Sequence, residues 1–147
     1  MADILHSVQT SAAAEAILPL VSTAAGFQRW WAEDVTEPDG AVELGFFNRQ
    51  TVYRLRLQGR PSAERTEWLC ETGAEWSGTR LIFVMEAKAG GTLVRFTHAE
   101  WQAPTDYFVS CTTAWGELMF RLKAEAEGKT RGPFFTRGGS SYELLVG

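Results

Sequence analysis

The fold is decided by residues 92–128, TLVRFTHAEWQAPTDYFVSCTTAWGELMFRLKAEAEG. The spacing of apolar residues in this stretch changes on either side of a short linker. Over residues 92–101 apolar and polar side chains alternate, which is typical of a half-buried β-strand. From an N-cap at Thr105 or Asp106, apolar residues then recur every three or four positions up to residue 127. We therefore expect a strand followed by a long helix, with Gly128 ending the helix as a C′ glycine.

The expected helix has two distinct faces. Its apolar stripe consists of Phe108, Cys111, Trp115, Leu118, Met119, Leu122 and Ala126. On the other side Glu117 stands four residues before Arg121, and Lys123 stands four residues before Glu127. Such pairs add ~0.2 to 0.5 kcal/mol each on a solvent-exposed helix face.

Four more segments of strand character precede this stretch, at residues 41–47, 51–58, 66–71 and 79–87. The connections contain Asn48, Gly59, Pro61, Gly73, Gly78, Gly90 and Gly91, and such short spacing favours an antiparallel meander. Alternation places one set of residues inward: Val42, Leu44, Phe46, Tyr53, Leu55, Leu57, Trp68, Cys70, Leu81, Phe83, Met85, Val94, Phe96 and His98. The opposite, solvated face carries Arg54, Arg56, Glu67, Glu71, Arg80, Arg95 and Thr97.

The N-terminal third is predicted to contain one strand and two short helices. Residues 2–9 alternate, with Ile4, His6 and Val8 facing inward. A helix is expected over residues 11–20, capped by Thr10 or Ser11 and ended or kinked by Pro19. After a break at Gly26, the aromatic residues Phe27, Trp30 and Trp31 share one side of a second short helix. Residues 37–40, EPDG, form a turn.

Composition bounds the class of protein. The 147 residues suit a single domain, and no window approaches the ~18 to 20 apolar residues of a membrane helix. A net charge of -4 argues against nucleic-acid binding. Cys70 and Cys111 lie outside any C-x-x-C pattern, and the first ten residues lack the features of a secretory signal, so we expect a cytoplasmic protein.

Three segments together resemble a known superfamily: FQRWWAED at residues 27–34, GGTLVRFTHAEW at residues 90–101 and AWGELMFRLKAEAEGK at residues 114–129. The chain is similar to the START-like or SRPBCC superfamily, in the branch related to the C-terminal domain of the activator of heat-shock-protein-90 ATPase. The matching positions are Trp30, Trp31, Thr92, Val94, Phe96, His98, Trp115, Met119, Leu122, Lys123 and Gly128.

The resemblance implies an α+β helix-grip fold. In this fold a curved antiparallel sheet wraps around a long C-terminal helix, with two short helices after the first strand. The resemblance covers residues 3–128, which we expect to form a single START-like domain. Residues 129–147 form a tail whose aromatic residues Phe134, Phe135 and Tyr142 are expected either to pack back on the domain or to fray.

The superfamily also implies a cavity between sheet and helix. Relatives hold an apolar ligand there, and small-molecule sites usually measure ~300 to 1,000 Å³. The chain has six Trp, nine Phe and three Tyr to line such a cavity or to fill a core. The expected cavity residues are Trp31, Tyr53, Leu55, Trp68, Phe83, Met85, Phe96, His98, Trp115 and Met119.

His98 is the main candidate for chemistry, because alternation points it inward. It is either a general base, with Glu100 or Tyr53 as its partner, or a structural histidine bonded within the core. Glu86, near the end of the adjacent strand, faces outward by strict alternation. His6, His98 and the two cysteines do not stand at metal-ligand spacing, so no metal or cofactor is expected.

Three functional hypotheses remain, and we favour the first. The chain binds a small hydrophobic or amphipathic ligand without catalysis. Alternatively, it is an enzyme of the cyclase or dehydratase type that uses His98 as base, or an interaction module similar to the chaperone activator. A homodimer formed through an exposed edge strand is a further hypothesis.

Overall fold

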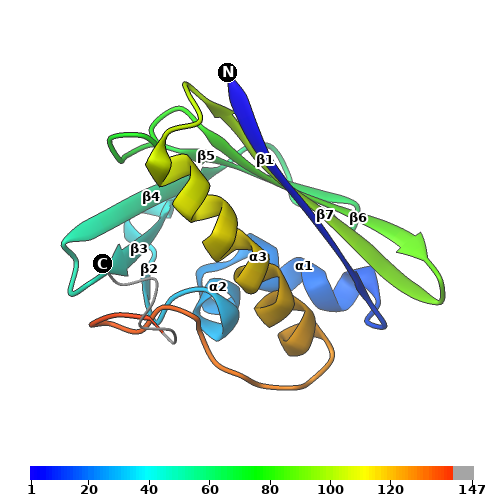
Figure 1. Cartoon of the computed structure of the whole chain (residues 1–147). Coiled ribbons are helices and arrows are strands. Elements are labelled where there is room, and N and C mark those ends of the chain that lie inside the picture. Colours follow the sequence, from blue (N-terminus) through cyan, green and yellow to red (C-terminus); the bar gives the residue numbers. More distant parts are fainter. Residues whose placement is uncertain (141–147) are drawn as a thin grey trace.

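A curved antiparallel sheet holds a long helix in its concave face (Figure 1). The structure is a computed structural model that describes residues 1–140; Tyr142, Leu144 and Leu145 of the tail lie outside the described residues. The seven strands are β1 (Ala2–Thr10), β2 (Asp34–Thr36), β3 (Val42–Phe46), β4 (Thr51–Leu57), β5 (Arg65–Cys70), β6 (Arg80–Lys88) and β7 (Gly91–Trp101). Their spatial order is β1-β7-β6-β5-β4-β3-β2, with every neighbouring pair antiparallel.

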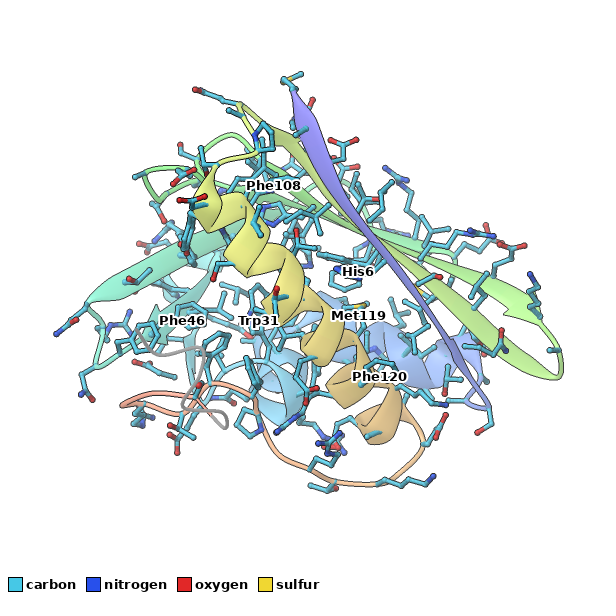
Figure 2. The ribbon with its side chains drawn as sticks, in the orientation of Figure 1. His6, Trp31, Phe46, Phe108, Met119 and Phe120 are labelled. Carbon is cyan, nitrogen blue, oxygen red and sulfur yellow. The ribbon has the colours of Figure 1, made fainter. Side chains whose placement is uncertain are left out.

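The helices are α1 (Ala14–Ser22), α2 (Ala24–Trp30) and α3 (Asp106–Ala126), with a 3-10 turn η1 (Pro38–Gly40) before β3. Thr105 caps α3 by accepting a hydrogen bond from the Phe108 N–H at 3.2 Å. Met119 is buried whereas its neighbour Phe120 is 57% exposed, so α3 presents one face to the sheet and the other to solvent (Figure 2). The predicted helix-grip α+β fold is confirmed.

Among the strands of the described residues, only β2 was not predicted from the sequence. It has three residues and pairs with β3, so it is too short to show a period. Its Asp34 carboxylate is buried and accepts a hydrogen bond from Arg49 Nη1 at 2.8 Å. That ion pair ties β2 to the turn between β3 and β4.

The first helix begins later than predicted and runs through Pro19. α1 starts at Ala14 because Thr10 Oγ1 accepts from the Ala12 N–H, which holds the preceding chain in a turn. Pro19 cannot donate to the carbonyl of Glu15, one turn earlier. Both residues are exposed, so water can satisfy that carbonyl and the helix continues to Ser22.

Gly26 lies inside α2, where a chain break was expected. A Cβ at this position would lie 2.1 Å from the Pro19 carbonyl oxygen and 2.7 Å from the Leu20 Cα. Since both contacts are backbone, no side-chain rotation can relieve them. Gly26 therefore allows α1 and α2 to approach closely, and this approach sets the path of the chain into the Trp30–Trp31 pair.

A matched pair of substitutions tests this close approach. We expect Gly26→Ala to lower the free energy of unfolding by about 1 to 3 kcal/mol through overpacking. In contrast, a Cβ at Gly116 of α3 meets only His6 Cε1, at 3.6 Å. Gly116→Ala should raise stability by up to about 1 kcal/mol, because alanine is the better helix former. Urea unfolding followed by tryptophan fluorescence measures both; equal effects would contradict the close approach.

The convex face of the sheet carries a network of ion pairs. Alternation along the strands predicted that these charged side chains face solvent. Arg56 Nε donates to Glu71 at 2.9 Å, and Arg80 contacts both Glu67 at 2.7 Å and Glu100 at 3.0 Å. Exposed pairs of this kind contribute about 0 to 1 kcal/mol each. The face is therefore polar and solvated.

Residues 131–135, which follow α3, fold back onto the domain. Arg121, expected on the solvent side of α3, is buried: its Nε donates to Glu117 Oε1 at 3.2 Å, and its Nη1 donates to the carbonyls of residues 131–133 at 3.0 to 3.4 Å. Its guanidinium lies over the Phe134 ring, 5.7 Å from the ring centroid. Phe134 is fully buried, and the Phe134 and Phe135 N–H groups donate to the carbonyls of Trp30 and Trp31.

Within residues 1–140, no helix is long and apolar enough to cross a membrane.

Candidate functional site

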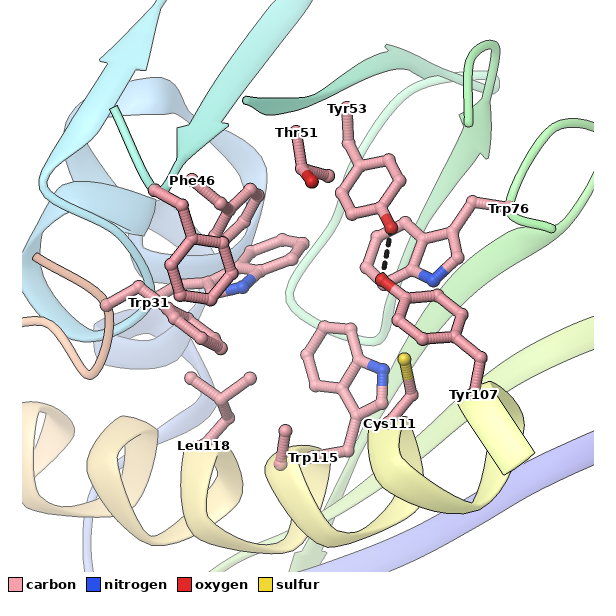
Figure 3. Close-up of a pocket in the computed structure, with 12 residues that line it drawn as sticks. Trp31, Phe46, Thr51, Tyr53, Trp76, Tyr107, Cys111, Trp115 and Leu118 are labelled. Carbon is pink, nitrogen blue, oxygen red and sulfur yellow. Dashed lines mark hydrogen bonds between the residues drawn. The ribbon is translucent and has the colours of Figure 1, made fainter. Parts of the chain in front are cut away.

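A partly open pocket of about 150 Å³ lies between α3 and the β3–β4 end of the sheet (Figure 3). Its lining residues come from the end of α2, from β3 and β4, from the β5–β6 loop, from α3 and from the returning C-terminal segment. They are Trp31, Phe46, Phe47, Thr51, Tyr53, Trp76, Tyr107, Cys111, Ala114, Trp115, Leu118 and Phe135. The volume is below the predicted range because Trp31, Trp76 and Trp115 occupy the space between sheet and helix.

The walls are mainly aromatic rings in mutual contact. Trp31 and Trp115 meet with ring centroids 4.9 Å apart, so α2 and α3 contribute adjoining walls. Tyr53 stacks on Trp76 at 3.9 Å with an interplanar angle of 7°, which joins β4 to the β5–β6 loop. Because the side chains hold one another, the pocket is formed before any ligand arrives.

Hydroxyl groups supply the polarity of the pocket. The hydroxyls of Tyr53 and Tyr107 are hydrogen-bonded to each other, which links β4 to the first turn of α3 (Figure 3). Burial raises the pKa of Tyr53 to about 12, and it also raises the pKa of Tyr107. Thr51 adds a third hydroxyl beside Tyr53. All three groups are therefore neutral near pH 7.

The two cysteines are both buried thiols. Cys111 lines the pocket, and burial raises its pKa to about 11. Cys70 lies in β5, away from the pocket lining, and burial raises its pKa to about 12. A thiol that is protonated near pH 7 is a weak nucleophile, so neither cysteine is poised for covalent chemistry.

His98 does not line the pocket; it lies behind the pocket wall. Its Nδ1 accepts a hydrogen bond from Trp115 Nε1 at 3.1 Å, which places the ring proton on Nε2. Nε2 then donates to Thr79 Oγ1 at 2.8 Å, and Thr79 Oγ1 donates to the Trp76 carbonyl at 2.5 Å. Burial lowers the pKa of His98 to about 3. This chain of bonds fixes Trp115 and Trp76, two walls of the pocket.

Glu100 points to solvent, although alternation predicted that it shares the inward face of His98. β7 has one extra residue here: Ala2 pairs with Trp101 and Ile4 pairs with His98. Glu100 takes a φ of 70°, its N–H bonds Asp3 Oδ1 at 2.9 Å, and its carboxylate pairs with Arg80. The bulge reverses the facing of Glu100, so it lies apart from His98 and the pocket.

The other expected cavity residues separate into two groups. Trp31, Tyr53 and Trp115 line the pocket. The rest are buried in the surrounding core and do not line it: Leu55, Trp68, Phe83, Met85, Phe96 and Met119. Trp68, for example, donates from Nε1 to the Val21 carbonyl at 2.8 Å. His6 of β1 faces α3, with its Nε2 3.1 Å from the Thr112 carbonyl oxygen (Figure 2).

Sequence reasoning missed several lining residues, for different reasons. Phe46, Cys111 and Leu118 do fall on the predicted inward faces, so alternation and the helical stripe contain a signal for them. Trp76 lies in a loop and Phe135 in the returning segment, where no period exists. Over residues 1–140 no group of three or more His, Cys, Asp or Glu side chains is arranged to hold a metal ion.

Comparisons with known proteins agree with this architecture. No protein-family model and no curated protein matches the sequence. Among solved structures, the solution structure of the Aha1 dimer from Colwellia psychrerythraea has a TM-score of 0.77 and 25% identity, over 88% of this chain and 98% of that one. The AHSA1-like protein of Aeromonas hydrophila has a TM-score of 0.63 and 14% identity, over 88% and 96% of the two chains.

A third similar structure is a START superfamily protein of Mycobacterium smegmatis, with a TM-score of 0.64 and 15% identity. It covers 87% of this chain and 99% of its own. These likenesses span nearly the whole of each solved chain, including the sheet and the long helix. The chain therefore has the helix-grip fold of the START/SRPBCC superfamily, in its Aha1-like form.

Proposed function

We propose that this protein binds one small hydrophobic or amphipathic molecule in the pocket between the sheet and α3. The observation that carries the proposal is the lining itself: aromatic walls around a partly open space, with three neutral hydroxyls on one side. Ligand sites usually combine mostly apolar walls with a few polar groups that fix orientation. The similar solved structures support the fold alone. The kind of ligand is inferred from the residues that line this pocket.

The volume restricts the size of the ligand. An apolar cavity of about 150 Å³ accommodates a molecule the size of benzene. Trp31 and Trp115 offer ring faces and edges for stacking against such a molecule, and Leu118 adds an aliphatic contact. A one-ring molecule fits this space, and a larger ligand would need the walls to move apart.

The chemistry of the lining supports binding more than turnover. Acid–base catalysis works best with a group whose pKa lies near the working pH. Tyr53, Tyr107 and Cys111 all have raised pKa values, and both ring nitrogens of His98 are engaged behind the wall. The cyclase or dehydratase hypothesis would require His98 to leave both of its partners.

Native mass spectrometry of the freshly purified protein tests the binding proposal. We expect a fraction of molecules to carry a discrete adduct that solvent extraction releases for identification. The control is Ala114→Phe, which places a ring inside the pocket and should remove the adduct while the protein remains folded. An adduct that persists in Ala114→Phe, or a wild-type protein that carries none, would contradict the proposal.

We also propose that the protein forms a homodimer. The Colwellia relative is a dimer by its description, and β1 is an edge strand whose outward Leu5 is 70% exposed. An exposed edge with an apolar side chain can pair with a second copy. The same native mass spectrum reports the number of subunits, and a monomer at every concentration would contradict this proposal.

A further inference from the structure

The tyrosine pair at the pocket also borders a second, outer hollow. That hollow measures about 470 Å³ and is open to solvent. It is lined by Gln50, Thr51, Val52, Tyr53, Gly73, Ala74, Glu75 and Tyr107. Thr51, Tyr53 and Tyr107 therefore belong to both spaces. These hydroxyls lie between the two spaces. A ligand in the inner pocket therefore contacts them on its side nearest the outer hollow.

The hydrogen bonds of this pair leave capacity for a ligand. When one tyrosine hydroxyl donates to the other, the second hydroxyl keeps its own proton, and both oxygens keep lone pairs. The pair thus offers at least one acceptor, and the proton that is not used within the pair lies within reach of both Cys111 and an approaching group. A neutral hydroxyl or carbonyl oxygen can bond here while the Tyr53–Tyr107 bond remains in place.

The charges around the two spaces disfavour an anion. Among residues 1–140, no Lys, Arg or His lines either the pocket or the outer hollow. Glu75 is the one acidic side chain in these linings over the described part of the chain, and it accepts a hydrogen bond from Thr105 Oγ1 at 2.5 Å. Its charge adds to burial in raising the pKa of Tyr53 and of Cys111. A ligand carboxylate beside the tyrosine pair would have no cation to bond and would lie near the like charge of Glu75.

We infer that the ligand is a neutral molecule with one aromatic ring and a single hydroxyl or carbonyl oxygen. The ring lies against Trp31 and Trp115, and the oxygen bonds the Tyr53–Tyr107 pair. This inference rests on the proposed binding function and specifies its ligand class. The pocket volume limits the ligand to a single ring, and the hydroxyl pair provides a site for a single oxygen. Because no cation of the described residues lines the pocket, we expect a neutral ligand.

Fluorine NMR titrations with three one-ring probes test each element of the inference. The probes are 4-fluorophenol, fluorobenzene and 4-fluorobenzoate, titrated near neutral pH. We expect 4-fluorophenol to bind about two- to tenfold more tightly than fluorobenzene, the usual net gain from one hydrogen bond. We expect 4-fluorobenzoate to bind at least about tenfold more weakly than 4-fluorophenol, because its charge finds no cation and lies near Glu75.

Two conservative variants test whether the oxygen of the probe bonds the Tyr53–Tyr107 pair. Tyr107→Phe and Tyr53→Phe keep the rings, including the stack of Tyr53 on Trp76, and each removes one hydroxyl. Each should reduce the advantage of 4-fluorophenol and leave fluorobenzene affinity unchanged. The double variant Tyr53→Phe/Tyr107→Phe should remove most of the advantage, because a single remaining hydroxyl can still bond the probe. Ser110→Ala is the matched control, because it removes an exposed hydroxyl from α3 outside the pocket lining.

The outcomes separate this inference from the function on which it rests. If fluorobenzene and 4-fluorobenzoate bind as tightly as 4-fluorophenol, or if both tyrosine variants bind all three probes like the wild type, the ligand class is overturned and the binding function stands. If no probe binds and the purified protein carries no adduct, both are overturned.

Discussion

Phe134→Ala is expected to lower the free energy of unfolding by about 3 to 5 kcal/mol, the usual cost of emptying a fully buried phenylalanine site. The Phe134 ring is 0% exposed and lies against Arg121 and Phe135. The loss would show that the segment after α3 is part of the folded unit. Urea unfolding monitored by circular dichroism measures it.

Phe135→Ala is the matched control in the same segment. Phe135 is half-buried and forms part of the pocket wall, with its ring centroid 5.0 Å from that of Phe46. We expect a smaller loss, about 1 to 2 kcal/mol, because less apolar surface is removed from contact. Equal losses for the two variants, or a negligible loss for Phe134→Ala, would contradict the packing of this segment.

Local periodicity predicted most of the fold, because most elements have one buried face. The antiparallel strands and α3 follow from alternation and from the 3.6-residue stripe, and both depend on near neighbours in the chain. The resemblance then supplied what periodicity cannot, namely that the sheet curves around α3. β2 escaped prediction because three residues give no pattern.

The wrong predictions concern side chains whose surroundings depend on residues far away in the sequence. Glu100 faces outward because one extra residue in β7 shifts the alternation, and a bulge leaves no simple mark in the sequence. Arg121 bonds Glu117 as predicted, yet it is buried because residues 131–134 return to cover it. A helical pattern predicts which side chains are neighbours, and it does not predict what covers them.

The pocket was the least predictable feature for the same reason. Inward-facing residues can line a cavity or fill a core, and alternation does not distinguish the two. Phe83 and Phe96 meet at 5.0 Å within the core, whereas Trp31 and Trp115 border open space. The difference depends on how six tryptophans of fixed volume fit together, including Trp76 from a loop.

Acidification is expected to destabilise the protein through His98. Its ordinary pKa of 6.5 falls to about 3 in the folded state because the ring is buried. Between these values the unfolded chain binds one more proton than the folded chain, so the free energy of unfolding decreases as the pH falls. The slope is about 1.4 kcal/mol per pH unit for one proton. Above pH 6.5 both states hold the ring neutral, and His98 adds no pH dependence.

His98→Gln isolates this effect from the other titrating groups. The amide cannot protonate in this range, and it can still donate a hydrogen bond toward Thr79. We expect the variant to be less stable than the wild type near pH 8, because the Trp115 indole N–H loses its acceptor. Its disadvantage should then shrink by about 1.4 kcal/mol for each pH unit below 6.5. Urea unfolding of both proteins between about pH 4 and about pH 8 gives the two curves.

The shape of the difference between these curves decides the role of His98. Converging curves mean that the folded protein keeps the imidazole neutral and bonded to Trp115 and Thr79, so that it supports two pocket walls rather than exchanging protons with a ligand. Parallel curves would mean that the folded state protonates His98 as easily as the unfolded chain does. Its bonds would then open readily, and the hypothesis of a catalytic base would gain the accessible imidazole that it requires.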